Sequence, residues 1–476
     1  MTPTLETRTR PERLTALDTS FLRIESPRTP LHIAAMLVLD GTPWRDDAGC
    51  IRLDDLRAYV GRHLHLAPRL RQVVREVPFD VARPVWCDDV DFDLSHHIRL
   101  AHLPSPGDDA ALVRLTEELM MTCLDRSRPL WEWWVIDGLT GGRVALVEKV
   151  HHAAIDGVSG VQLMAALSDL GELVPPPDEP WEPAEWPSAT DLLSDAALDL
   201  AREPWRLMIE ATHLFRHQLH RAGGLLRWPT WESRVLRSAR IGSRRRLEPV
   251  VLSLTEVKAI GHAHGTKVND VVLGIVAGGL RELLVSRGIE PEGEELHALV
   301  PESVRAEDEH LALGNRVGGM FAPLRVDEPD PLRRLELIRD VMCEKRSQHE
   351  GEAASELLDA ADRLPEVAIR LLLHLIDQQP FASTVVTNIP GPREPLSVMG
   401  APVESMVPVV PLAGRVTLGI AVLSYLDDLT IALWADADAH PDLDVMVEGM
   451  RSTYEVLRAT GSSSVRTRRG GRPPPC

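Results

Sequence analysis

Two adjacent histidines followed by an Asp-Gly pair are the residues of this sequence best suited to chemistry. His151 and His152 lie in the stretch EKVHHAAIDGVSG, and Asp156 and Gly157 follow the second histidine after three residues. Imidazole accepts and returns a proton near neutral pH because its unperturbed pKa is ~6.5. The stretch is compatible with a metal site, with a general base and its orienting carboxylate, or with an ordinary strand-to-helix turn.

A metal site is the least favoured of these interpretations. Zinc takes three or four protein ligands, whereas neighbouring side chains on a strand point to opposite faces. The sequence has no H-E-x-x-H motif, and none of its five cysteines forms a C-x-x-C pair. We therefore expect no metal and no resident cofactor.

The remaining two interpretations both fit the local sequence. Asp-Gly after a strand is a common turn, and this chain carries a second histidine pair, His96 and His97, without such a turn. A strand end that enters a tight turn can also project His152 into a cleft, while Asp156 holds the turn or the histidine tautomer. There is no G-x-S-x-G elbow and no cysteine nearby. A base at this place would act directly on a substrate hydroxyl or thiol, without an acyl-enzyme intermediate.

The elements that must position this motif can be predicted from periodicity and turn residues. Leu31–Gly41 is expected to be a buried strand that ends at Asp-Gly. Trp131–Gly138 and Gly141–Val150 are expected to form a hairpin. Val158–Gly171 has the pattern of an amphipathic helix that ends at glycine. The proline density of Val174–Asp191 excludes a helix there and indicates an extended connector.

These elements predict an α/β (α+β) fold of two halves, each a mixed sheet flanked by helices, joined by a Pro-rich and helical crossover. The length of 476 residues allows two to three domains. The expected division is a disordered start at 1–12, an N-terminal half at 13–173, a connector with a helical bridge at 174–249, a C-terminal half at 250–460 and a flexible basic tail at 461–476.

Composition narrows the classes of partner. The formal net charge of -19 disfavours binding to nucleic acid, whose phosphates would be repelled. The polar N-terminus lacks the apolar region of a secretory signal. No run of 18 uncharged apolar residues is present, so we expect a protein that does not span a membrane and lies in the cytoplasm.

The motif H-H-x-x-x-D-G resembles the signature of CoA-dependent acyltransferases, which include chloramphenicol acetyltransferase-like enzymes, plant acyltransferases and peptide-synthetase condensation domains. Further blocks resemble one bacterial family, the wax ester synthase/diacylglycerol acyltransferases, over roughly residues 12 to 458. In chain order these blocks are Leu14–Gly41, Pro129–Leu139, Asn269–Leu284, Leu299–Arg305, Leu313–Leu324, Thr387–Leu396 and Leu423–Asp436.

The resemblance implies two chloramphenicol acetyltransferase-like halves with a tunnel between them and the histidine motif at its middle. Acyl-CoA, a co-substrate, would meet a long-chain alcohol or a diacylglycerol there, and His152 would act as general base. His151 and Asp156 would support its geometry. Gly157, Asn269 and Asp270 are the expected substrate-binding residues, although Asn269 also suits a helix N-cap.

Two departures from the family pattern leave the acyl acceptor open. The family usually has a glycine shortly after the Ser-Tyr of its last block, where this chain has Leu426 and Asp427, and Glu302 stands in place of a valine. Two other functions remain as alternatives: a carrier-protein-dependent acyltransferase or condensation enzyme, and a non-catalytic lipid-binding protein.

A membrane or lipid-droplet surface is a further expected partner, because the implied substrates are water-insoluble. The segment Glu203–Trp231 places aromatic and apolar residues on one helical face, which suits either an interfacial helix or a bridge packed on the two halves. The arginines 244–246 and those of the tail could attract anionic lipid. The oligomeric state is not predicted.

Overall fold

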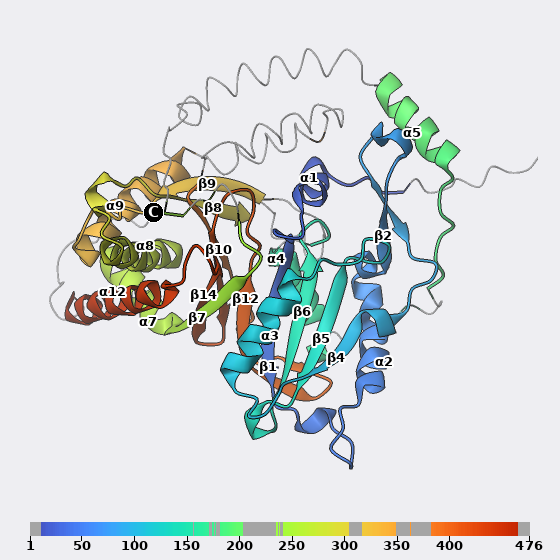
Figure 1. The fold of residues 1–476 in the computed structure, drawn as a ribbon, viewed down its shortest axis with the longest axis horizontal. Coiled ribbons are helices and arrows are strands. Elements are labelled where there is room, and N and C mark those ends of the chain that lie inside the picture. The colour runs from blue at the N-terminus through green and yellow to red at the C-terminus, as the bar shows by residue number, and fades with distance from the viewer. Residues whose placement is uncertain are drawn as a thin grey trace, which may run out of the picture.

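The computed structural model shows two sheet-centred halves side by side (Figure 1). The residues that it describes are 11–155, 157–170, 181–202, 241–303, 317–348 and 382–464, with isolated positions at 174, 175, 177, 235, 236, 238 and 362. The expected bridge segment at 203–231 and the expected tail lie outside the described residues, apart from the first residues of the tail.

The N-terminal half is built on a six-stranded sheet with the order β11-β12-β1-β6-β5-β4. Only β4 and β5 run parallel in it. Its strands are β1 (His32–Leu39), β4 (Ile98–His102), β5 (Trp131–Asp137), β6 (Val144–His151), β11 (Ser397–Val398) and β12 (Ala401–Val409). The predicted strand at residues 31–41 is thus β1, and the predicted hairpin is the antiparallel pair β5 and β6.

Helices cover both faces of this sheet. On one face α2 (Leu53–His63) and α4 (Gly157–Ala166) contribute apolar side chains to a core with the sheet. On the other face lies α3 (Asp109–Met121), which begins where the Asp108 side chain accepts a 2.7 Å hydrogen bond from Ala111 N–H. The strand β6 is buried along its whole length because it is sandwiched between these layers.

The C-terminal half has a second six-stranded sheet, of order β7-β14-β13-β10-β8-β9. In it β10 runs parallel to both of its neighbours and the other pairs are antiparallel. Both sheets are therefore mixed, as predicted. The strands are β7 (Arg245–Ser253), β8 (His297–Ser303), β9 (Val317–Pro323), β10 (Thr384–Ile389), β13 (Leu418–Tyr425) and β14 (Asp428–Asp436).

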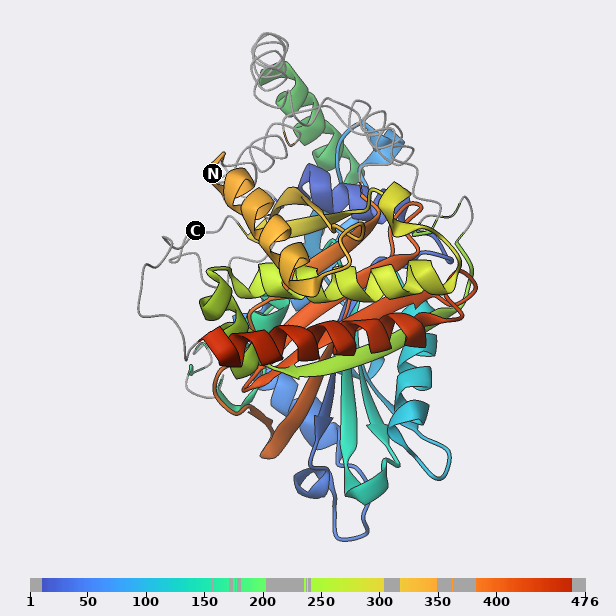
Figure 2. The ribbon, with the colours of Figure 1, turned by 90° about the vertical axis from the view of Figure 1, so that its left-hand side faces the viewer.

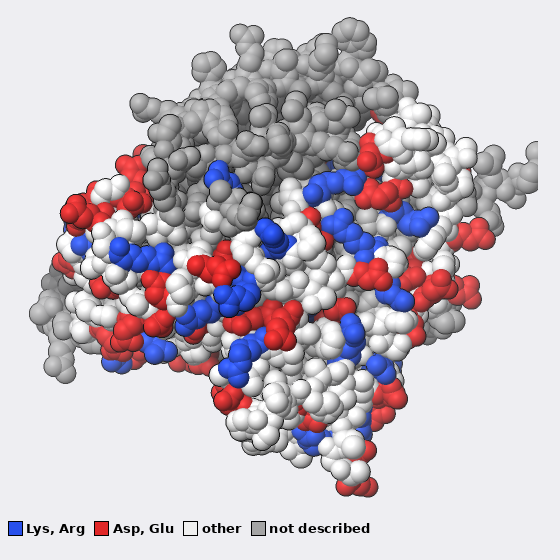
Figure 3. Space-filling view, in the orientation of Figure 1, with Lys and Arg blue, Asp and Glu red and all other residues white. Residues whose placement is uncertain are grey.

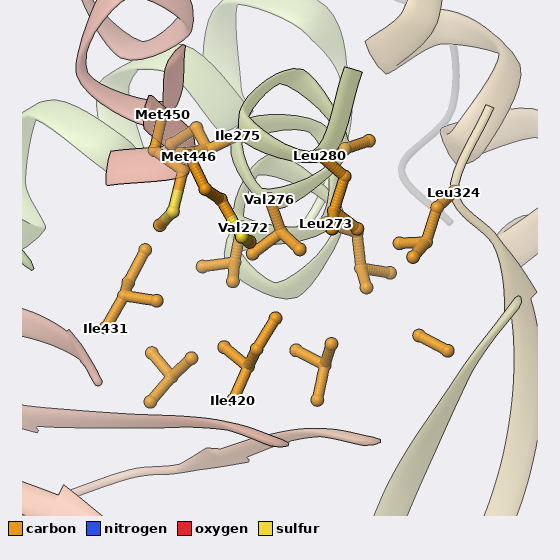
Figure 4. Packing of buried hydrophobic residues seen from close by; sticks show 14 of the residues in the cluster. Val272, Leu273, Ile275, Val276, Leu280, Leu324, Ile420, Ile431, Met446 and Met450 are labelled. Carbon is orange, nitrogen blue, oxygen red and sulfur yellow. The ribbon is translucent and has the colours of Figure 1, made fainter. Parts of the chain in front are cut away.

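Two long helices, α8 (Val268–Ser286) and α12 (Leu443–Ser464), lie side by side over one face of this sheet (Figure 2). They pack closely because α8 has glycines at the contact: a Cβ on Gly278 would stand 2.0 Å from Thr453 Oγ1. Side chains of α8 fill the space between Met446 and Met450 of α12 and the sheet (Figure 4). The same face also carries α7 (Leu254–His264) and α9 (Pro331–Ser347).

Two strands of the N-terminal sheet, β11 and β12, come from the C-terminal part of the sequence. β12 comes from the late part of the sequence, yet it pairs antiparallel with β1 at the edge of the N-terminal core (Figure 1). Asp169, shortly after α4, holds the segment that contains β11 and β12 in place. Its carboxylate accepts hydrogen bonds from Ser397 Oγ at 2.5 Å and Gly400 N–H at 3.0 Å, and also from Tyr59 OH at 2.7 Å. A late segment therefore completes the early sheet.

The described part of the connector is extended, as its prolines predict, and it docks on the small sheet of β2 (Gln72–Arg75) and β3 (Val85–Asp88) before α5 (Ala189–Arg202). The Arg75 guanidinium lies 4.1 Å from the ring centroid of Trp186, whose Nε1 also donates to Asp88 O.

Candidate functional site

The end of β6 sets the position of the two histidines. The His151 N–H donates to Leu130 O at 2.9 Å and the His152 N–H donates to Leu31 O at 2.8 Å, so both neighbouring chain segments hold this point of the backbone. The strand ends there, and a short turn leads into α4 at Gly157. The sequence thus forms the predicted strand-turn-helix unit.

His151 points into the protein and is 1% exposed. Its Nδ1 accepts a hydrogen bond from Ala153 N–H at 3.0 Å, and its Nε2 lies 3.4 Å from Glu25 Oε1. Because Nδ1 accepts, the proton of the neutral ring is on Nε2, the nitrogen nearest the carboxylate. His151 is therefore an anchored side chain that shapes the turn.

Glu25, directly after α1 (Ala16–Ile24), is the centre of a buried polar cluster that sequence reasoning missed. Its Oε1 lies 3.3 Å from His32 Nε2 and accepts from Leu31 N–H at 3.1 Å, while its Oε2 accepts from Arg126 Nη2 at 2.8 Å. Burial would raise the pKa of Glu25, but the hydrogen bonds from His151, His32 and Arg126 outweigh it and hold the pKa well below its ordinary value.

This cluster joins residues that are far apart in the sequence. Burial lowers the pKa of His32 to about 4, so His32 is neutral at pH 7 despite its acidic neighbour. No sequence signal reveals the cluster, because Glu25, which follows α1, and His32, which begins β1, meet His151 only through the fold.

His152 lies differently from its neighbour. It is half-buried, and its ring stacks at an angle on Phe21 of α1, with 4.3 Å between the ring centroids and 31° between the planes. Alternation along β6 places it on the face of Glu148 and Val150, opposite His151. The pair therefore consists of one sealed, anchored imidazole and one half-buried imidazole, and of the two only His152 is exposed enough to reach a substrate.

Asp156 lies outside the described residues, and of Gly157 only its place at the start of α4 is described. Asn269 is not the N-cap of α8, which corrects that interpretation: the helix begins at Val268, and Lys267 occupies the cap position. The reason is that the Asp270 side chain accepts from Lys267 N–H at 3.2 Å, so Asp270 takes over the capping function.

Asp270 is fully buried and holds the start of α8. Its carboxylate also accepts from Thr266 Oγ1 at 2.8 Å and pairs with Arg346 of α9, a residue that sequence reasoning missed. Asn269 is half-buried beside it, and its Oδ1 has no hydrogen-bond partner among the described residues. An amide oriented by so rigid a neighbour and left with a vacant acceptor suits contact with a substrate group.

The predicted site residues come from both halves. The histidines end β6 in one half, whereas Asn269 and Asp270 begin α8 in the other (Figure 1). Within the described ranges, no group of three or more His, Cys, Asp or Glu side chains is arranged to hold a metal ion. No helix of this part of the chain is both long and apolar enough to cross a membrane.

On the face of the molecule that is turned to the viewer in Figure 1, basic and acidic side chains are intermixed over the described residues (Figure 3).

Two family models match this chain, one in its first part and one in its last. A family model described as "Wax ester synthase/diacylglycerol acyltransferase catalytic domain" matches residues 14–272, and one described as "WS/DGAT C-terminal domain" matches residues 313–458. The probable diacylglycerol O-acyltransferase tgs1 of Mycobacterium tuberculosis is 30% identical over 474 residues, covering 96% of this chain and 98% of the relative. A putative diacylglycerol O-acyltransferase of Mycobacterium bovis matches with the same values.

Solved structures show the same fold. The wax ester synthase/diacylglycerol acyltransferase from Marinobacter aquaeolei VT8 aligns with a TM-score of 0.66 and 26% identity, covering 94% of this chain and 100% of that one. The first condensation domain of the CDA synthetase aligns with a TM-score of 0.60 at 16% identity, covering 95% and 97%, which is a likeness of fold alone.

Proposed function

This chain belongs to the wax ester synthase/diacylglycerol acyltransferase family, and from this premise we propose that it transfers a fatty acyl group from acyl-CoA to the hydroxyl of a long-chain alcohol or a diacylglycerol. The products are a wax ester or a triacylglycerol and free CoA. The observation that carries the proposal is the pair of unlike imidazoles, with half-buried His152 beside the anchored His151.

In the proposed reaction His152 removes the proton of the acceptor hydroxyl while the oxygen attacks the thioester carbonyl carbon. The C–O bond forms and the carbonyl electron pair moves to oxygen, which gives a tetrahedral oxyanion. When the pair returns, the C–S bond breaks, and the imidazolium gives its proton to the departing thiolate. The imidazole is thus regenerated, and no covalent enzyme intermediate is needed.

The neighbours of His152 support this role by restricting movement. The Glu25 carboxylate holds the His151 ring, and the backbone of His152 is fixed to Leu31 O, so the base is presented with little conformational freedom. Asn269 contributes a polar contact to the reacting groups from the other half. Its amide carries both a vacant acceptor and donors, which suits either the hydroxyl or the oxyanion.

The experiment compares wild type and His152→Ala with palmitoyl-CoA and either hexadecanol or dipalmitoylglycerol. CoA release is followed with a thiol reagent and the lipid products are resolved. We expect wild type to release CoA with ester formation and the variant to lose about 10²-fold to 10⁴-fold in rate with an unchanged melting temperature. The matched control is His96→Ala, which removes a solvent-exposed imidazole from the other histidine pair. An undiminished rate in His152→Ala would refute the general-base role.

The same assay separates the alternatives. Ester formation from free acyl-CoA excludes a requirement for a carrier protein. A wild-type protein that binds lipid without releasing CoA would be a lipid-binding protein of this fold, and the proposed transfer would be wrong.

Attachment to a lipid surface is part of the proposal, and an exposed apolar loop supports it. Phe79 is 88% exposed and has a φ of 63°, and Val81 is 55% exposed. Arg23 of α1 binds Glu76 beside this loop with an N–O distance of 2.9 Å, so the loop is tied to the helix that carries Phe21. Arginines 244 and 246 are paired with carboxylates and Arg245 is buried, so they supply little free charge.

Flotation with phosphatidylcholine vesicles tests this attachment. We expect the double variant Phe79→Ser, Val81→Ser to float markedly less than wild type, whereas Leu426→Ser, which alters an exposed apolar residue elsewhere, should float like wild type. Equal flotation of all three proteins would exclude the loop as the point of contact.

A further inference from the structure

Glu148 of β6 is a buried carboxyl that the proposed reaction does not use. It is 9% exposed, and its cross-strand neighbours are Ala35 and Trp133. On its own strand Leu146 and Val150 flank it on the same apolar face. No described residue gives it a hydrogen bond or an ion pair. A polar group in such surroundings destabilises the fold unless it serves another purpose.

The surroundings explain why this carboxyl is neutral near pH 7. Burial alone raises the pKa of Glu148 to about 8. The helix α4 above it contains no ionisable residue. On α2 the ionisable side chains of the same face are Tyr59, which donates to Asp169, and His63, whose Nδ1 lies 2.8 Å from Tyr59 O. Tyr425 of β13 donates to Val403 O.

An apolar stripe connects Glu148 with the proposed base His152; in it Ile33 and Ala35 are partly exposed, whereas Val150 is only 7% exposed. Glu148, Val150 and His152 lie on one face of β6, and Ile33 and Ala35 of β1 stand opposite Val150 and Glu148. Both β1 residues are partly exposed, and Ala35 is flanked by Pro408 of β12 and Glu148 of β6. A side chain between two paired strands is normally sealed, so the exposure of Ala35 indicates open space along this face.

Gly160 of α4 lies next to the same stripe: a Cβ there would stand 3.9 Å from Ile33 Cδ1, an ordinary van der Waals distance. The four residues from Glu148 to His152 correspond to about 13 Å at ~3.3 Å per strand residue. The stripe is therefore long enough for a substantial part of a fatty chain.

Resting on the proposed function, we propose that the stripe of Ile33, Ala35 and Val150 holds the hydrocarbon chain of one substrate and that Glu148, at its far end, limits the length of that chain. A short chain leaves the carboxyl in contact with water. A longer chain covers the carboxyl and removes this water without offering a hydrogen-bond partner, which weakens binding of long chains relative to short ones.

Two series of substrates test the proposal on wild type, Glu148→Leu and Glu148→Gln. One varies the acyl-CoA from octanoyl through dodecanoyl to stearoyl with a fixed alcohol, and the other varies the alcohol over the same lengths with a fixed acyl-CoA. We expect Glu148→Leu to raise kcat/KM for the longest chain relative to the shortest about tenfold, and Glu148→Gln to keep the wild-type ratio. The series that responds identifies which substrate chain occupies the stripe.

The dependence on pH gives a readout that a purely structural residue would not change. Above pH 8 the wild-type carboxyl ionises, so discrimination against long chains should increase, whereas Glu148→Gln should show no such change. The control is Glu118→Leu, which removes an exposed carboxylate from α3. Glu148→Leu should melt no lower than wild type because it replaces an unpaired buried carboxyl with an apolar side chain.

The outcomes are distinguishable from failure of the proposed function. If wild type releases no CoA at any chain length, the transferase proposal fails. If wild type is active but Glu148→Leu retains its length profile in both series, Glu148 does not limit the chain and this inference is wrong.

Discussion

The Glu25 carboxylate joins two histidines that are more than a hundred residues apart: its Oε1 lies 3.3 Å from His32 Nε2 and 3.4 Å from His151 Nε2. This contact ties the end of α1 and the start of β1 to the last residue of β6. The residue that follows in the chain is His152, so the carboxylate fixes the backbone next to the proposed base.

Replacement of Glu25 by alanine should lower kcat by about 10-fold to 100-fold, with little change in KM for either substrate, because the His151 ring loses its anchor. Glu25→Gln should be milder, since the amide oxygen can still accept from His151. Steady-state kinetics measure the effect, and Glu76→Ala, on the surface near α1, is the control. If Glu25→Ala lost activity only in proportion to its unfolded fraction, the anchor would have no role in catalysis.

Alanine substitutions of Asn269 and Asp270, neighbours at the start of α8, should affect different properties: the first should lower activity and the second stability. Asp270→Ala should lower the free energy of unfolding by about 3–5 kcal/mol because Arg346 loses its buried carboxylate. Asn269→Ala should leave this free energy nearly unchanged and lower kcat. Urea unfolding and initial rates separate the two effects. Equal stability losses in both variants would mean that Asn269 is structural as well.

The hydrogen bonds accepted by Asp169 should stabilise the docking of β11 and β12 on the N-terminal sheet. Asp169→Ala removes the acceptor for Tyr59, Ser397 and Gly400 and should cost about 3 kcal/mol, whereas Tyr59→Phe should cost about 1 kcal/mol. Faster proteolytic cleavage near residue 400 in Asp169→Ala would accompany the loss. A normal melting temperature in that variant would show that β12 is held by its strand pairing alone.

Stability should rise between pH 5 and pH 6.5 because three histidines, two of them buried and one half-buried, are neutral in the folded protein. Burial lowers the pKa of His32, His297 and His440 to about 4. Between the folded pKa and the unfolded value of ~6.5 the unfolded chain binds a proton that the folded chain does not, so the folded state gains stability as pH rises. His440→Gln should reduce the difference between pH 7 and pH 5 by about 2 kcal/mol.

Urea unfolding at the two pH values measures this difference. The amide introduced by His440→Gln can still pair with Thr417 Oγ1, which lies 2.8 Å from His440 Nε2, so the fold should be retained. Glu148 acts in the opposite direction: its folded pKa of about 8 is raised, so its contribution to stability decreases as pH rises from ~4.3 towards 8. An unchanged pH dependence in His440→Gln would show that this imidazole does not titrate in the unfolding reaction.

Local features of the site could be predicted from the sequence because they depend on neighbouring residues. The hairpin of β5 and β6, the turn after His152 and the separation of the two imidazoles all follow from strand alternation and glycine turns. The cluster of Glu25, His32 and Arg126 could not be predicted, because its members meet only through the fold.

Asp427 stands in a turn where the family usually has a glycine, and the structure shows what its side chain contacts. Leu426 has a φ of 54° in the turn between β13 and β14, and Asp427 accepts hydrogen bonds from Ser253 Oγ at 2.9 Å and Thr255 N–H at 3.0 Å. The Asp427 carboxylate therefore binds the N-cap residue Ser253 and the first turn of α7. The Asn269 N-cap was wrongly interpreted because the helix begins earlier than expected: Lys267 is the cap residue, and the Asp270 side chain accepts from its N–H.

The pairing of β1 with β12 has a consequence for biosynthesis. Until residues 401–409 have left the ribosome, β1 has an unsatisfied hydrogen-bonding edge, although the strands on its other side are already synthesised. Such an edge can recruit strands from other nascent chains. Premature termination before this point should therefore yield an aggregating fragment, and chaperone dependence should be greatest late in translation.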